Sequence, residues 1–183
     1  SSSTQKLDNA SSVTASGTGH FIYDRQNKKY SQNNRFIIKG GSVFTASSFV
    51  TYATSGTFNE THVSGNEMLI TGTGSKLVVD GQNKSFSIGA GAGEDFTVRV
   101  ENGGEISGQA TVNFGSSNNR LIVDGGKLSS KFSLANTNNL VAIRNVSNLT
   151  LSLPTTPDPM GGSYNRFVLS DDASVILPTT YLF

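Results

Sequence analysis

The chain of 183 residues has no cysteine and no tryptophan, and few of its residues are charged. Without cysteine the chain has no disulfide bridge, no thiolate metal site and no cysteine nucleophile. Charged side chains make up 15% of the sequence and give a formal net charge of +1. A soluble domain averages about 25% charged residues, and a nucleic-acid-binding domain carries a strongly basic face. We therefore expect no nucleic-acid partner.

The sequence also lacks long apolar runs and contains only four prolines. A membrane-spanning helix needs about 20 consecutive apolar residues, so no membrane insertion is expected. The prolines, Pro154, Pro157, Pro159 and Pro178, all follow residue 153. Because proline has no N–H to donate to a strand ladder, the proline-free stretch 1–153 suits strands that pair with neighbours on both sides.

What the sequence does contain is a repeat. Each unit opens with a polar, Asn-rich stretch, continues with a β-branched or aromatic run, turns at a Gly, Asn or Asp corner, and ends with a second apolar run. A third short apolar run, such as 85–88 or 111–114, separates the units. The units open at Asn34, Asn66, Glu94, Asn119, Asn139 and Asn165, at intervals of 20 to 32 residues.

Two or three short strands per unit, joined by glycine corners and without helical periodicity, predict one coil of a β-solenoid. A single coil cannot bury its apolar side chains, so the coils must stack. We expect an all-β chain of about six coils in one domain, 1–183: an N-terminal cap or first coil over 1–32, regular coils over 33–153, and a loop and last coil over 154–183. The recurring Asn suits either a left-handed corner or side-chain amides stacked along the axis.

The rhythm Asn-Asn-Arg-apolar-Gly-Gly occurs at 33–41 and again at 118–126. It resembles bacterial autotransporter-type passenger and adhesin repeats and, more broadly, right-handed parallel β-helix proteins. The resemblance covers residues 33–183. It implies a single-stranded right-handed parallel β-helix at an extracellular or cell-surface location in a bacterium.

Some β-helices of this kind act on polysaccharides, so the carboxylates are candidates for an acidic site. Glycoside hydrolysis needs two carboxyl groups that face one sugar. Asp171 and Asp172 are the only adjacent aspartates, but they occupy a corner where other units carry Gly-Gly, and this position favours a turn role. The sequence indicates no catalytic residue, no metal ligands and no cofactor.

Arg35, Arg120 and Arg166 share one repeat position and form a candidate row on the surface. Glu67 and Asp95 occupy or adjoin the same position in other units, so the sign of the charge alternates. Alternation favours ion pairs between coils over a catalytic base.

These observations favour a structural or adhesive protein whose rigid stack displays variable loops over 51–65 and 154–163. Its expected partner is a glycan or a surface protein. Self-association is a further expectation, because the ends of a solenoid expose unpaired strands and the chain ends in Leu182-Phe183. The alternative function is that of a carbohydrate-active β-helix, a polysaccharide lyase or a glycoside hydrolase.

Overall fold

The structure of the protein is a computed structural model, and it describes residues 4–15, 17–24, 31–54, 63–89, 94–147, 149–150 and 162–176. These residues form strands and turns and contain no helix. No helix long and apolar enough to cross a membrane therefore occurs among them. The prolines, most of the two expected variable loops and Leu182-Phe183 lie outside the described residues.

Most strands belong to three parallel sheets. Sheet A has seven strands, β1 (Thr4–Leu7), β5 (Arg35–Ile38), β9 (Glu67–Thr71), β12 (Thr97–Glu101), β15 (Arg120–Asp124), β18 (Leu140–Arg144) and β20 (Arg166–Ser170). Sheet B has five, β2 (Ser12–Thr14), β6 (Val43–Ala46), β10 (Lys76–Val79), β13 (Glu105–Ser107) and β16 (Lys127–Leu128). Sheet C has five, β3 (Thr18–Asp24), β7 (Ser48–Thr54), β11 (Ser85–Ile88), β14 (Thr111–Phe114) and β17 (Lys131–Ser133).

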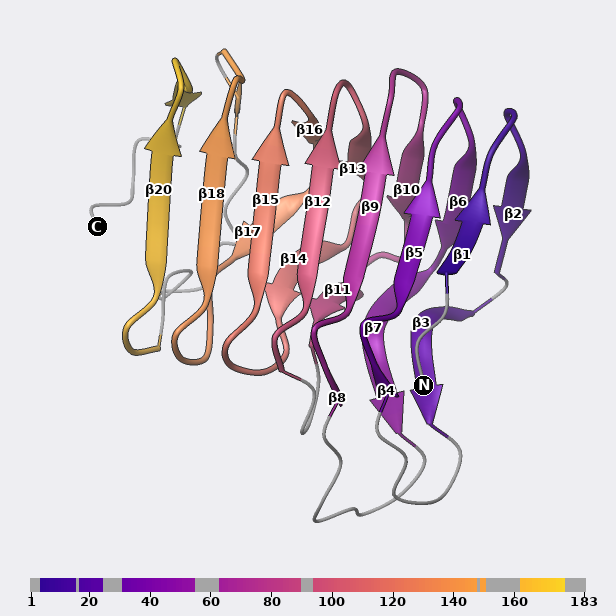
Figure 1. Cartoon of the computed structure of the whole chain (residues 1–183), viewed down its shortest axis with the longest axis horizontal. Helices are drawn as coiled ribbons and strands as arrows, with labels where there is room; N and C mark the ends of the chain where they lie inside the picture. Colours follow the sequence, from indigo (N-terminus) through magenta and orange to yellow (C-terminus); the bar gives the residue numbers. More distant parts are fainter. Residues whose placement is uncertain are drawn as a thin grey trace.

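From β1 to β17 the chain visits sheet A, sheet B and sheet C in turn, with β4 (Ser31–Gln32) and β8 (Val63–Ser64), a small parallel pair, lying before the first two returns to sheet A (Figure 1). From β18 on, the described strands alternate between sheet A and a second small parallel pair, β19 (Leu149–Thr150) with β21 (Val175–Ile176). This repetitive parallel arrangement, with strands stacked in register, is solenoid-like. We call one passage through the three sheets a coil.

The apolar runs seen in the sequence are these strands, and the third short run of each unit is the strand of sheet C. Residues 4–24 supply the first strand of each sheet. One alignment was wrong. The residue that corresponds to Asn66 in the next coil is Phe96, not Glu94, because Glu67 pairs with Thr97. An apolar residue stands where the other units carry asparagine, so the Asn signal is lost there.

The core is a set of columns inside the stack. Successive residues of a strand alternate between a buried and a partly exposed position, as in Glu67–Thr71 and Thr97–Glu101. Strands that pair in register place equivalent side chains on top of one another. One such column in sheet A is fully buried and consists of Ile38, Ile70, Val100, Val123 and Ile143.

Aromatic side chains add a second motif to this core. Phe36, Phe44, Phe49 and Phe86 form a chain of edge-to-face contacts, with ring centroids 5.8, 5.7 and 5.4 Å apart. The chain links strands of all three sheets. Edge-to-face pairs contribute about 0.5–1.5 kcal/mol beyond the burial of area.

The recurring asparagines bond along the axis of the stack. The backbone N–H of Asn34 donates to Oδ1 of Asn66 at 2.9 Å, and that of Asn119 donates to Oδ1 of Asn139 at 2.8 Å. The residue before each asparagine often has a left-handed backbone, as Asn33 (φ 55°) and Asn118 (φ 62°) do. The left-handed corner and the side-chain amide that bonds along the axis are thus both present, at adjacent residues.

Candidate functional site

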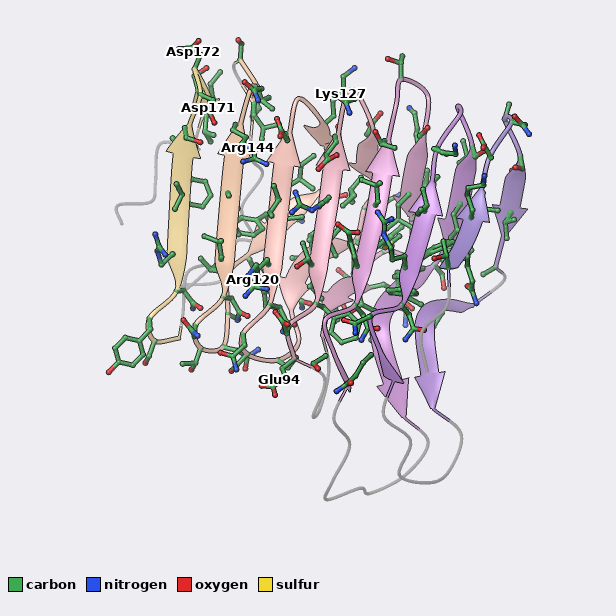
Figure 2. The ribbon with its side chains drawn as sticks, viewed as in Figure 1. Glu94, Arg120, Lys127, Arg144, Asp171 and Asp172 are labelled. Carbon is green, nitrogen blue, oxygen red and sulfur yellow. The ribbon has the colours of Figure 1, made fainter. Side chains whose placement is uncertain are left out.

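Asp171 and Asp172 lie in the turn after β20, where both are exposed (Figure 2). Their φ angles are 52° and 61°, a left-handed conformation that Gly40 and Gly41 adopt at the same point of an earlier coil. This is the turn geometry that the sequence predicts. Ser170 Oγ donates to Asp171 Oδ2 at 3.0 Å, and the backbone N–H of Asn145 donates to the Asp171 carbonyl at 3.0 Å.

The three arginines of the predicted row do lie in one line across sheet A. In register, the line runs from Arg35 through Glu67, Thr97, Arg120 and Leu140 to Arg166. Arg35 Nε lies 2.8 Å from Glu67 Oε2, and Arg120 forms an ion pair with Asp95. The ion pairs between coils that the sequence predicts are therefore present, and the line is not a continuous basic surface.

Sequence reasoning missed a second pair of carboxylates. Glu67 Oε1 lies 2.9 Å from Arg99 Nε, and Glu101 Oε1 lies 3.3 Å from Arg99 Nη1. Both carboxylates thus face one guanidinium on the outward face of sheet A. The alternation of apolar and charged residues along β12 predicts that Arg99 and Glu101 share the outward face. It does not predict that Glu67, in the neighbouring strand, contacts Arg99.

Other outward charges also alternate in sign between coils. Arg144 Nε lies 2.8 Å from Asp124 Oδ2, and Lys76 Nζ lies 3.0 Å from Glu105 Oε2. Lys127 follows Glu105 in register and is exposed (Figure 2). Exposed pairs of this kind contribute about 0–1 kcal/mol each.

One carboxylate has a shifted pKa. The backbone N–H of Asn9 donates to Asp8 Oδ1 at 2.9 Å, and the side chain of Lys39 lies 3.1 Å from Oδ2. These two contacts, the hydrogen bond from Asn9 first, lower the pKa of Asp8 below its usual value of 3.8. Within the described part of the chain, no three His, Asp or Glu side chains come close enough together to hold a metal ion.

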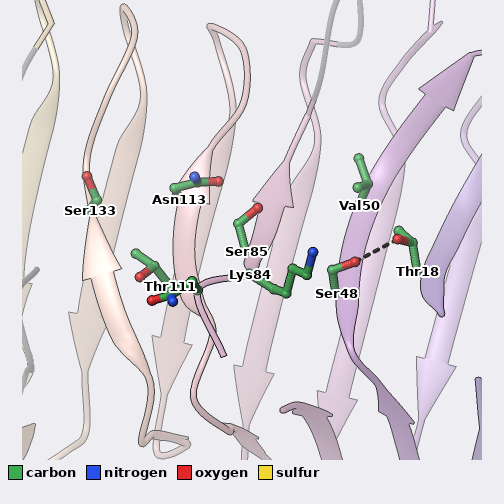
Figure 3. Close-up of a pocket in the computed structure, with 9 residues that line it drawn as sticks. Thr18, Ser48, Val50, Lys84, Ser85, Thr111, Asn113 and Ser133 are labelled. Atoms are coloured by element: carbon green, nitrogen blue, oxygen red, sulfur yellow. Dashed lines mark hydrogen bonds between the residues drawn. The ribbon is translucent and has the colours of Figure 1, made fainter. Parts of the chain in front are cut away.

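The outward face of sheet C carries a shallow polar hollow of about 590 Å³ (Figure 3). Hydroxyl and amide side chains from every strand of the sheet line it, among them Thr18, Ser48, Ser85, Thr111, Asn113 and Ser133. The Thr18 and Ser48 hydroxyls are hydrogen-bonded at 2.7 Å, and Ser87 Oγ donates to Asn113 Oδ1 at 2.9 Å. Sequence reasoning did not identify this face. Its signal is the alternation of Ser, Thr and Asn with buried residues in β11 and β14.

A second hollow of about 450 Å³ lies where the chain turns into sheet A. Its lining combines acidic, amide and arginine side chains, namely Glu94, Asp95, Asn118, Arg120, Asn138 and Arg166. Figure 2 shows Glu94 and Arg120 at this edge of the sheet. Of the predicted surface row, only Arg120 and Arg166 reach this hollow.

The chain was compared with protein-family models, with curated protein sequences and with solved structures. No family model matches it, and neither a curated protein nor a solved structure matches it.

Proposed function

We propose that the protein is a secreted or cell-surface β-solenoid of a bacterium, with a structural and adhesive role and without catalytic activity. In this proposal the stack is a right-handed, single-stranded parallel β-helix of about six coils, of the kind found in autotransporter-type passengers and adhesins. Its function is to hold a polar surface rigid so that a glycan or another surface molecule can dock.

The observation that carries the proposal is the polar hollow on sheet C. Its hydroxyl and amide groups come from strands that pair in register, such as Ser85 with Thr111. The buried sides of the same strands carry Phe49, Phe86, Val112 and Phe132, each at most 1% exposed. Packing fixes these strands, so the outward groups lose little freedom when a ligand binds.

A glycan suits this face because its hydroxyl groups both donate and accept hydrogen bonds, as Ser, Thr and Asn side chains do. Parallel strands repeat about every 4.8 Å, so the hollow offers equivalent groups at regular intervals. Each hydrogen bond contributes about 0.5–1.5 kcal/mol net, and binding requires several at once. The expected affinity for one sugar is weak, and it rises for a longer chain.

The test is binding of neutral plant, algal and host polysaccharides to the immobilised protein. We expect at least one to bind, and Thr111→Val to weaken that binding about 2- to 10-fold through loss of a hydroxyl. Thr97→Val is the matched control, because Thr97 also faces outward from a strand but lies on sheet A. No binding across the panel, or equal loss in the two variants, would contradict the proposal.

The alternative is a carbohydrate-active β-helix, and the specific observation in its favour is the Glu67–Arg99–Glu101 cluster. Hydrolysis requires one carboxyl group to be a proton donor and the other to act on the sugar or on water. Turnover of any polysaccharide in the panel that Glu67→Gln or Glu101→Gln abolishes would replace the adhesive proposal. The same outcome with Asp171→Ala or Asp172→Ala would place the chemistry at the turn.

A further inference from the structure

The hollow at the edge of sheet A is lined by two acidic and two arginine side chains, whereas Lys84 is the one charged residue among the described residues that line the sheet C hollow. At the edge of sheet A these side chains are Glu94, Asp95, Arg120 and Arg166. Arg120 forms an ion pair with Asp95, so these two charges compensate each other. The remaining charged groups that a ligand could contact are Glu94 and Arg166.

Glu94 is engaged by a chain of side-chain amides. Asn118 Nδ2 donates to Glu94 Oε2 at 3.0 Å, and Asn138 Nδ2 donates to Asn118 Oδ1 at 2.8 Å. The two hydrogen bonds run across three consecutive coils in one direction. They hold Glu94 at one end of the hollow, while Asn138, two coils along, directs its Nδ2 back to Asn118.

Arg166 lies at the opposite end and is exposed. The remaining arginines in the described part of the chain, Arg35, Arg99, Arg120 and Arg144, each form an ion pair. The guanidinium of Arg166 forms none with a described residue. An arginine that keeps its five N–H donors available is a bidentate receptor for a carboxylate or a sulfate.

Leu140 lies between Arg120 and Arg166 in the register of sheet A and also lines the hollow. Its strand, β18, lies between the strand of Arg120, whose charge is compensated by Asp95, and the strand of Arg166. An apolar floor beside an arginine and an amide suits a sugar ring, which has apolar C–H groups as well as hydroxyls.

We infer that this hollow is a subsite for an anionic oligosaccharide, whose acidic group pairs with Arg166 while sugar hydroxyls bond to Asn138. A hollow of about 450 Å³ is large enough for more than an isolated anion. The inference goes beyond the proposed function, because it assigns a charged class of ligand to a different sheet from the polar hollow.

The experiment is calorimetric titration of the full chain with three trisaccharides of equal length, one of hexuronate, one carrying sulfate esters and one neutral. We expect at least one anionic trisaccharide to bind, and to bind about tenfold more weakly to Arg166→Gln because a charge-assisted contact is lost. Its affinity should fall as salt rises, since salt screens an exposed charge. The comparison of uronate with sulfate identifies which acidic group the site takes.

Arg35→Gln is the matched control, because Arg35 occupies the same register position outside the hollow. Arg35→Gln should leave the affinity for the anionic trisaccharide unchanged. Thr111→Val should also leave it unchanged, because Thr111 lines the sheet C hollow and its substitution is expected to weaken only the binding of the neutral polysaccharide. The inference is overturned if neither anionic trisaccharide binds, if the neutral one binds as tightly, or if Arg35→Gln weakens binding as much as Arg166→Gln. Loss of binding in Thr111→Val alone would support the sheet C site and overturn the one at Arg166.

Discussion

Several asparagine side chains form hydrogen bonds between neighbouring coils. Asn119 is fully buried and uses its whole side chain. Its Oδ1 accepts from the backbone N–H of Phe96 at 2.9 Å, and its Nδ2 donates to Ser116 Oγ at 3.0 Å and to the Ser117 carbonyl at 2.8 Å. The side chain joins two coils and also closes the turn that precedes its own strand.

Replacing Asn119 by alanine should lower the free energy of unfolding by about 1–3 kcal/mol. The substitution leaves the buried N–H of Phe96 and the part-buried carbonyl of Ser117 without these partners. Equilibrium urea unfolding, followed by circular dichroism, measures the change. Asn113→Ala is the control, because Asn113 faces the sheet C hollow and should change stability by no more than about 0.5 kcal/mol. Equal effects in the two variants would show that burial of the amide network does not matter.

The Asn signal could be found in the sequence because it recurs before similar apolar runs. Its exact geometry could not, since a left-handed corner and a stacked amide are both compatible with Asn-Asn. The pair Asn118-Asn119 uses one residue for each. The misplacement at Glu94 has the same origin, because Phe96 keeps only its backbone donor in this network and provides no amide to recognise.

Individual strands are short, so their stability depends on what they stack against. Phe86 in β11 is fully buried, and its ring meets that of Phe49 in the neighbouring strand β7. Ser85 and Ser87, on the same strand, face outward towards the polar hollow and the Asn113 amide. One strand thus carries the core on one side and a candidate binding surface on the other.

Phe86→Ala should cost about 3–5 kcal/mol, because it removes a buried ring and leaves a cavity in the column. Phe86→Leu keeps most of the volume and should cost less than half as much. Urea midpoints of the two variants, compared with the wild type, provide the test. A loss below about 1 kcal/mol for Phe86→Ala would mean that neighbouring coils collapse into the space.

Strand positions were predictable from the alternation of apolar and polar residues, and the corners from Gly, Asn and Asp. The acidic turn at Asp171–Asp172 was found in this way, by comparison with Gly-Gly in other units. The hollows were not, because they depend on which strands become neighbours. Asn138 and Glu94, for example, lie far apart in the chain and meet only through Asn118.

At the scale of the whole molecule, many of the charges in the described part of the chain pair between coils. Arg35 with Glu67 and Arg144 with Asp124 join strands that are neighbours in sheet A. Their alternation keeps the net charge near zero and disfavours a shift of one coil against the next, which would bring like charges together. Among the described arginines only Arg166 departs from this pattern, and it is there that a ligand can supply the missing charge.

The order of the strands in the three sheets also determines how the molecule resists tension. Hydrogen bonds between coils run along the stack, so a force that pulls β1 away from β20 loads the ladders in series rather than in shear. The weakest ladder should open first and release one coil of 20 to 32 residues, which extends by about 60–110 Å. Because the chain has no cysteine, Thr4→Cys and Ile176→Cys provide unique attachment points for single-molecule pulling. A series of such steps is expected, and one abrupt release of the whole stack would contradict it. Coils that yield one by one would let the molecule lengthen under load while its remaining turns stay folded.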